Sequence, residues 1–258
     1  MKIKNPRTGI EMHVLESGSG DPIILVHGLS GNYTRWGVVG ERLSARHRVI
    51  NYDIRGHGLT EKGPGLDCGF DAHVEDLAGL MEHAGIERAV VVGQSLGGMI
   101  VQHFALAYPE KVSKLVLVVT TACVMRGRVK PRFMRTATKI LPYVPGILSK
   151  SVRKKSAHLP DELFPERAQP ELDFHPACVG RCIQAIVGMD IRERVRGLEM
   201  PVLVVASKQD ALVDPAQERE LAELIPGAKL VEIDSPSHFV SLQRPDELTA
   251  AISAFIEN

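Results

Sequence analysis

The sequence predicts an α/β protein with a mostly parallel, eight-stranded sheet, flanking helices and a helical segment inserted between two core strands. Short apolar, β-branched runs alternate with longer segments of helical period, which is typical of a parallel sheet built from βα units. A Gly-x-Ser-x-Gly turn joins one of these runs to one of these helical segments. The 258 residues, 44% hydrophobic and 24% charged, suit one globular core of this class.

Six runs are predicted to be core strands because each is nearly continuous in apolar residues, as strands covered on both faces should be. The predicted strands are Pro22–His27, Arg48–Tyr52, Ala89–Val92, Lys114–Val119, Pro201–Ala206 and Lys229–Ile233. The first 16 residues are predicted to form a hairpin with its turn near Asn5–Gly9, which adds two strands.

Four helices are predicted from hydrophobic period and start signals. They are Asp71–Ala84, Leu96–Tyr108, Pro215–Leu224 and Pro245–Ile256. The last two begin with proline, whose missing N–H costs little at the first position of a helix.

Residues 122–197 break the alternation and are predicted to form a helical lid between core parts 1–121 and 198–258. Within this stretch, the run Arg126–Lys155 contains ten Lys or Arg and no Asp or Glu. We interpret the run as the solvated face of an amphipathic lid. The alternatives are attraction of anionic substrates and transient docking on a lipid surface through residues such as Phe133, Ile140 and Leu141.

Charge and composition narrow the classes of partner. The formal net charge is zero, with 31 basic and 31 acidic side chains, so no global field would recruit nucleic acid or an anionic membrane. The N-terminal segment lacks the apolar core of a signal peptide, and no stretch approaches the roughly 18 apolar residues of a membrane span. We therefore expect a cytoplasmic protein that acts on a small molecule, without stable membrane insertion. The sequence carries no signal for an oligomeric state.

The four cysteines form no Cys-x-x-Cys pair and are predicted to be reduced. Cys178 and Cys182 are four residues apart, a spacing that suits a metal only if further ligands come from elsewhere. We interpret both as small buried residues. No metal or organic cofactor is predicted.

The turn Gly93-Gln94-Ser95-Leu96-Gly97 is the strongest functional signal because an apolar strand precedes it and a helix follows it. A serine at such a sharp turn has a strained backbone, and side chains at positions 93 and 97 would collide with the adjoining elements. The helix that begins at Leu96 directs free N–H groups toward the place where an oxyanion would form. We predict Ser95 as a nucleophile and the amides of Leu96 and Leu29 as oxyanion donors.

A serine nucleophile needs a base within hydrogen-bond reach and a third group that orients the base. His238 follows the last core strand and is therefore expected at the sheet edge that carries Ser95. Asp210, in a short loop after the penultimate strand, is predicted to be the orienting acid, with Asp214 as the runner-up. The preceding core strand ends in Val119–Ala122 and offers no carboxylate there.

Other polar residues near these turns are given structural roles. His27 is interpreted as a brace of the oxyanion loop rather than as a proton-transfer group. Asp53 and Arg55, in a glycine-rich loop, are interpreted as residues that fix this loop by hydrogen bonds and not as catalytic groups. Six more histidines are interpreted as structural or solvent-facing: His57, His73, His83, His103, His158 and His175.

Together these residues resemble the α/β-hydrolase superfamily, in particular its lid-bearing branch of carboxylesterases, enol-lactone hydrolases, carbon–carbon bond hydrolases and cofactor-free haloperoxidases. The resemblance rests on HGLSG at 27–31, DIRGHG at 53–58, GQSLGG at 93–98, the Asp210 loop and His238, in the chain order serine, acid, histidine. It implies a triad of Ser95, Asp210 and His238, and an oxyanion hole formed by the backbone amides of Leu29 and Leu96.

The resemblance also narrows the reaction. Dehalogenases and epoxide hydrolases of the superfamily carry aspartate in place of the serine, so Ser95 implies an acyl-enzyme route. The segment that starts at Cys178 and the short chain look most similar to 3-oxoadipate enol-lactonase and related small esterases. We therefore expect hydrolysis of small carboxylic esters or lactones. The alternatives are carbon–carbon hydrolysis of meta-cleavage products, perhydrolysis by hydrogen peroxide, and a ligand-sensing module with slow turnover.

Overall fold

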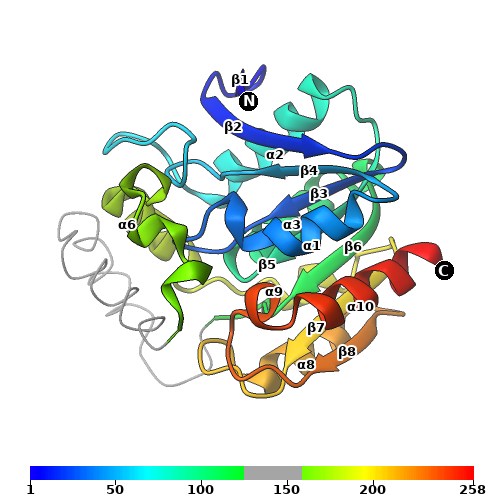
Figure 1. The fold of residues 1–258 in the computed structure, drawn as a ribbon. Helices are drawn as coiled ribbons and strands as arrows, with labels where there is room; N and C mark the ends of the chain where they lie inside the picture. The colour runs from blue at the N-terminus through cyan, green and yellow to red at the C-terminus, as the bar shows by residue number, and fades with distance from the viewer. Residues whose placement is uncertain (125–158) are drawn as a thin grey trace.

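The computed structural model describes residues 1–124 and 159–258, and its centre is one sheet of eight strands in the order β1-β2-β4-β3-β5-β6-β7-β8 (Figure 1). Strand β2 is antiparallel to both of its neighbours, and every pair from β4 to β8 is parallel. The strands are β1 (Lys2–Lys4), β2 (Glu11–Ser17), β3 (Pro22–Val26), β4 (Arg48–Tyr52), β5 (Ala89–Gln94), β6 (Val112–Val118), β7 (Val202–Ser207) and β8 (Lys229–Ile233). The predicted mostly parallel sheet, including the N-terminal hairpin, is confirmed.

Strand β8 departs from the prediction that every core strand is covered on both faces. It lies at the edge of the sheet, beyond β7, and Leu230 is 40% exposed. Its side chains are mostly exposed or half-buried, and Ile233 at its end is buried. An edge strand has one neighbour and less helix above it, so apolar residues alone did not indicate full burial here.

The helices are α1 (Gly37–Leu43), α2 (Phe70–His83), α3 (Leu96–Ala107), α6 (Pro176–Ile186), α7 (Arg192–Val195), α8 (Pro215–Leu224), α9 (Val240–Gln243) and α10 (Pro245–Glu257). Helices α2, α3, α8 and α10 agree with the four predicted helices to within one residue at each end. Helix α1 was not predicted, because two glycines in seven residues weaken its helical signal.

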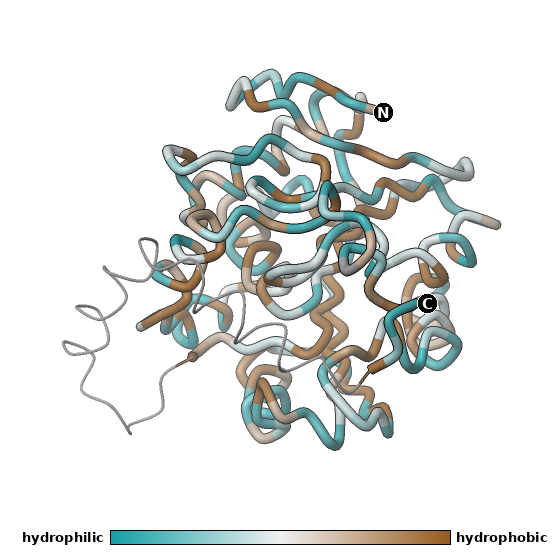
Figure 2. The backbone as a smooth tube through the Cα atoms, turned by 60° about the vertical axis from the view of Figure 1, so that its left-hand side comes forward, coloured by the Kyte–Doolittle hydropathy of each residue, from teal (hydrophilic) through white to brown (hydrophobic). Residues whose placement is uncertain are grey.

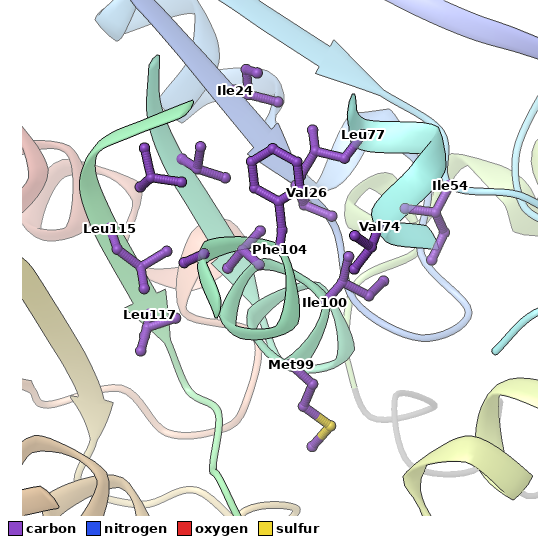
Figure 3. Close-up of a cluster of buried hydrophobic side chains, with 14 of the residues drawn as sticks. Ile24, Val26, Ile54, Val74, Leu77, Met99, Ile100, Phe104, Leu115 and Leu117 are labelled. Atoms are coloured by element: carbon purple, nitrogen blue, oxygen red, sulfur yellow. The ribbon is translucent and has the colours of Figure 1, made fainter. Parts of the chain in front are cut away.

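Alternate residues of the parallel strands point to opposite faces, and each face has its own helical cover. Ile23 and Leu25 of β3 pack in a cluster with residues of α1 and α10, whereas Ile24 and Val26 pack with residues of α2 and α3. In Figure 3, Phe104 of α3 lies among these β3 side chains and those of α2 and β6. Hydrophobic segments accordingly predominate in the middle of the molecule (Figure 2).

The described residues between β6 and β7 form three short 3-10 turns, Asp161–Leu163, Pro165–Arg167 and Pro170–Leu172, followed by α6 and α7. Helix α6 lies beside the loop after β4, where the amide of His175 donates to the carbonyl of Gly56 at 2.8 Å (Figure 1). The basic run Arg126–Lys155, with Phe133, Ile140 and Leu141, and His158 lie outside the described residues. The helical lid and its boundaries at 122 and 197 therefore stay predictions.

All four cysteines are buried and free, and the interpretation of Cys178 and Cys182 as small buried residues is confirmed. Cys178 and Cys182 project from α6 into the core that covers the α2 and α3 face of the sheet, and the Sγ atom of Cys182 lies 3.7 Å from Nε2 of His73. Within residues 1–124 and 159–258, no group of three or more His, Cys, Asp or Glu side chains is arranged to hold a metal ion. Among the same residues, no helix is long and apolar enough to cross a membrane.

Candidate active site

The predicted site residues all follow the carboxyl ends of parallel strands. Ser95 comes directly after β5, Asp210 follows β7, and His238 follows β8. Because β3 to β8 run in one direction, their carboxyl ends meet at one edge of the sheet. Topology therefore brings these loops together, although more than a hundred residues separate the first from the others.

Ser95 lies on a strained turn, with φ 54° and ψ −117°. Its amide donates to the carbonyl of Val118 at 3.0 Å, and its own carbonyl accepts from the Thr120 hydroxyl at 2.8 Å. A Cβ atom at Gly93 would lie 2.4 Å from the Gly97 carbonyl oxygen, and one at Gly97 would lie 2.2 Å from the Val26 carbonyl oxygen. A side chain at either position would collide with these backbone atoms, so both positions require glycine. The sequence predicts the same collisions.

The loop 27–31 lies directly against the Ser95 side chain. A Cβ atom at Gly28 would be 3.2 Å from Cβ and 3.8 Å from Oγ of Ser95. Leu29 is the next residue of this loop, and Leu96 is the first residue of α3. Within the part of the chain that the structure describes, neither of their amides donates to a protein acceptor. Two N–H groups near the serine are thus free to bind an oxygen atom.

Asp210 and His238 are in direct contact: Oδ2 of the aspartate lies 2.6 Å from Nδ1 of the histidine. The other carboxylate oxygen of Asp210 accepts from the amides of Leu212 at 2.7 Å and Val213 at 3.0 Å. Burial by itself would raise the pKa of Asp210, but the hydrogen bond and charge of His238 and the two amides hold it below its ordinary value. Asp210 is therefore a carboxylate that fixes one side of the His238 ring.

The loop that carries His238 is also bound to the serine turn. Gln94, the residue before Ser95, donates its side-chain amide to the carbonyl of His238 at 3.1 Å. The Gln94 amide oxygen in turn accepts from the Ser241 hydroxyl at 2.7 Å. Gln94 was not assigned a role from the sequence, because position x of the motif tolerates many residues and the partner lies 144 residues away.

The runner-up acid, Asp214, is exposed and has a different role. It is the N-cap residue of α8, and its carboxylate accepts from the amide of Ala216 at 2.9 Å. A carboxylate at this position stabilises the first turn of the helix. The structure thus brings Asp210, and not Asp214, to the His238 ring.

His27 is fully buried and braces the loop that it begins. Its Nδ1 lies 2.8 Å from the carbonyl oxygen of Gly28, and its Nε2 accepts from the amide of Ile54 at 3.1 Å. Burial lowers the pKa of His27, so the neutral ring that this pattern needs is favoured. His57, which is also buried, has its pKa lowered to about 3, chiefly by burial.

Asp53 and Arg55 fix loops, as predicted. The Asp53 carboxylate accepts from the amides of Tyr33 at 2.6 Å and Leu59 at 2.9 Å. The Arg55 guanidinium binds Asp76 of α2 through two nitrogens, each at 2.6 Å. Both side chains are almost fully buried. Their contacts hold the loop after β4 on the sheet and on α2.

Aromatic and apolar side chains surround the serine and histidine loops. Phe239, next to His238, makes an edge-to-face contact with Phe164 at a ring-centroid distance of 5.3 Å. The side chain of Leu29 packs against the cluster of Phe174 and Val179, in the region between β6 and β7. Phe164 and Phe174 were not singled out from the sequence, because a lone phenylalanine in a loop has no periodic signal.

Known proteins resemble this chain over its whole length. The model of the alpha/beta hydrolase fold family matches residues 21–146. A relative from Azorhizobium caulinodans, named "Putative carbamate hydrolase RutD", is 31% identical over 256 residues, which cover 92% of each chain.

Two solved structures are similar to this chain at 27% identity. An esterase from Thermogutta terrifontis superposes with a TM-score of 0.85, covering 100% of this chain and 97% of the other. An enol-lactonase from Burkholderia xenovorans superposes with a TM-score of 0.81 and covers 100% of both chains. With the serine turn and the eight-stranded sheet described above, these likenesses establish that the chain belongs to the alpha/beta hydrolase fold family.

Proposed function

We propose that this protein hydrolyses carboxylic esters or lactones of small molecules, with Ser95 as nucleophile, His238 as base and Asp210 as the acid that orients the base. The observation that carries the proposal is the contact of 2.6 Å between Asp210 Oδ2 and His238 Nδ1 at the sheet edge that holds Ser95. A carboxylate at Nδ1 favours the neutral tautomer whose proton is on Nδ1, and in that tautomer Nε2 is available to accept a proton, as a general base requires.

In the first half of the reaction, Nε2 of His238 takes the proton of the Ser95 hydroxyl while Oγ attacks the substrate carbonyl carbon. The carbonyl oxygen becomes negative, and the free amides of Leu29 and Leu96 stabilise it. The tetrahedral intermediate then breaks its bond to the leaving alcohol, which receives the proton from His238. The products of this half are the free alcohol and an ester of Ser95.

In the second half, water attacks the acyl-enzyme and gives one proton to His238. The bond between the carbonyl carbon and Ser95 Oγ breaks, and the serine takes this proton back as the carboxylic acid leaves. With a lactone, the leaving alcohol stays attached to the acyl group, so one hydroxy acid is released. No step requires a group other than the side chains, the two amides and water.

The apolar surroundings of the site favour a substrate with a hydrophobic acyl or alcohol group. The Phe239 ring contacts His238, Phe164 packs against Phe239, and Leu29 packs against an apolar cluster that contains Phe174. Excluding water from this region would strengthen the hydrogen bonds to the oxyanion. The similar esterase and enol-lactonase structures support this class of reaction.

The test is a panel of p-nitrophenyl esters from acetate to laurate, together with simple lactones and an enol-lactone. Initial rates are measured for the wild-type protein, for Ser95→Ala and for Ser19→Ala, an exposed serine that serves as the matched control. Cleavage that needs Ser95 and not Ser19 supports the proposal. Equal rates in the Ser95→Ala protein would exclude Ser95 as the nucleophile.

Carbamate hydrolysis is a second candidate, favoured by the relative that is 31% identical and carries that activity in its name. A carbamate has a carbonyl carbon open to the same attack, but an amine leaving group must be protonated by His238 before the bond breaks. The panel therefore includes a carbamate whose leaving group is an aromatic amine. Dienoic carbon–carbon substrates, and acetate with hydrogen peroxide, extend the panel if esters, lactones and carbamates are not cleaved.

A further inference from the structure

Glu218 is a buried acid directly behind the proposed site. It projects from α8, and its exposed fraction is 0%. One carboxyl oxygen, Oε2, accepts from the amide of Ser207 at 2.9 Å, whereas Oε1 is buried without a hydrogen-bond donor in the part of the chain that the structure describes. An ionised carboxylate with an unpaired oxygen is strongly disfavoured in such a place.

Ser207 joins Glu218 to Asp210, because its amide donates to Glu218 and its carbonyl accepts from the amide of Asp210, and the carboxyl groups of the two acids interact through charge and hydrogen bonding. Asp210 already receives hydrogen bonds from two amides and contacts His238, so the negative charge of the pair belongs on Asp210. Two adjacent buried carboxyl groups do not both ionise, because like charges repel strongly where water is excluded. Burial and the charge of Asp210 raise the pKa of Glu218 to about 9.

Ser207 connects Glu218 to both loops of the site. The amide of Ser207 binds Glu218, and its carbonyl accepts from the amide of Asp210 at 3.3 Å. The Ser207 hydroxyl donates to the carbonyls of Ser235 at 3.3 Å and Ser237 at 3.1 Å, in the loop that carries His238. Glu218 is thus bound to the residue, Ser207, whose hydrogen bonds hold both the Asp210 loop and the His238 loop.

We propose that Glu218 is a protonated positioning residue whose carboxylic O–H donates a hydrogen bond to the Asp210 carboxylate and holds it against His238. The chain of hydrogen bonds then runs from Glu218 through Asp210 to the His238 ring. This inference rests on the proposed function, because it takes Asp210 to be the group that orients the base.

The two arginines near α8 are paired with other acids. Arg219, the next residue of α8, binds Glu232 of β8, and Arg192 of α7 lies 3.6 Å from Glu220. These four side chains are partly exposed, so water and salt screen them. Asp210, with His238 behind it, is therefore the charge that governs the protonation of Glu218.

Two substitutions of Glu218 distinguish the effect of its proton from the effect of its packing. Glu218→Gln keeps an N–H donor for Asp210 and an oxygen for the Ser207 amide, but it cannot ionise. Glu218→Leu keeps most of the volume and removes the donor. Glu223→Gln removes an exposed carboxyl from the same helix and serves as the matched control. Circular dichroism verifies the fold of each variant.

The first measurement is infrared spectroscopy of the folded proteins at pH 7, in the carbonyl band of protonated carboxylic acids. We expect a band in the wild-type and Glu223→Gln proteins that is missing from Glu218→Gln. A band of equal size in Glu218→Gln, or no band in the wild type, would overturn the assignment of the proton. This readout needs no substrate, so it stays decisive if the proposed function is wrong.

The second measurement is the pH profile of kcat on an ester whose cleavage requires Ser95. We expect Glu218→Gln to retain the wild-type kcat near pH 7 and to lose the decline near pH 9 that the ionisation of Glu218 causes in the wild type. Glu218→Leu should lower kcat about tenfold with KM unchanged, the effect of removing one charge-assisted hydrogen bond.

An unchanged kcat in a folded Glu218→Leu protein, or the same alkaline decline in Glu218→Gln, would overturn the positioning role. If Glu218→Leu does not fold, the Glu218→Gln profile decides. If no Ser95-dependent substrate is found, the proposed function fails and the infrared band still tests the shared proton.

Discussion

The side-chain amide of Gln94 donates a hydrogen bond to the backbone carbonyl of His238 at 3.1 Å. This bond joins the turn that carries Ser95 to the loop that carries the proposed base, and Ser241 orients the Gln94 side chain from the other end. The Gln94 side chain therefore helps to position the loop of the proposed base relative to the Ser95 turn.

Replacing Gln94 by leucine should lower kcat about tenfold while the fold is retained. The substitution leaves the buried His238 carbonyl without its donor, at a cost of about 1–3 kcal/mol, and it frees the loop that positions the ring. Steady-state rates on the ester panel and thermal unfolding check this prediction. A kcat equal to that of the wild type would show that the loop is held by its other contacts.

Ser95→Ala should abolish ester cleavage and leave the free energy of unfolding unchanged or slightly increased. The hydroxyl is the nucleophile in the proposed mechanism, but the side chain is only partly buried and forms no cap with α3. Rates and thermal melting are compared with those of the Ser19→Ala control. A large loss of stability in Ser95→Ala would assign the serine a structural role instead.

Asp210→Asn should lower kcat by roughly 10⁴, the loss seen when the acid of such a triad becomes an amide and favours the wrong histidine tautomer. Asp214→Asn is the matched comparison, and it should retain most of its activity because asparagine also caps helices well. A greater loss of kcat in Asp214→Asn than in Asp210→Asn would reverse the assignment of the acid.

Arg35 and Glu166 form a buried ion pair that connects the turn Tyr33–Trp36 to the region between β6 and β7. The Arg35 guanidinium also donates to the carbonyl of Leu163 at 2.9 Å and lies over the Phe164 ring. Replacing Arg35 by methionine should cost about 3–5 kcal/mol of unfolding free energy, because Glu166 loses its charged partner and keeps the neutral side-chain amide of Asn32 at 3.3 Å. Denaturant titration of both single variants and the double variant measures this coupling; strictly additive losses would contradict it.

Glu218 should make the stability of the protein fall as pH rises from about 5 to 9. Its pKa in the folded protein is raised to about 9 from an ordinary value of 4.5, so over this window the folded state holds a proton that the unfolded state has released. The stability linked to this proton is complete below the lower pKa and is lost as pH rises through the window.

The matched comparison is the difference in unfolding free energy between Glu218→Gln and the wild type, measured by denaturant titration at several pH values. The difference should shift in favour of the variant as pH increases, because glutamine binds no proton in either state. A difference that does not change with pH would mean that the Glu218 side chain is already ionised in the folded protein.

The sequence alone determined the parallel strands, four of the helices and the turn at Ser95, because hydrophobic period and turn chemistry are local properties. It also assigned Asp210 and His238 to one sheet edge, since the carboxyl ends of parallel strands share that edge. The same local signals predict a hairpin over residues 1–16, and the structure shows β1 and β2 paired.

Only the tertiary structure decided which distant side chains meet. In the structure, β8 lies at the exposed edge of the sheet and Asp214 caps α8. Arg35 binds Glu166, which is 131 residues away in the sequence. The tertiary structure also buries Glu218 and joins it through Ser207 to the Asp210 loop, although on the sequence Glu218 is an ordinary acid in an amphipathic helix. Hydrophobic period shows which face of a helix is buried, but the partner of a buried acid depends on how helix and sheet pack together.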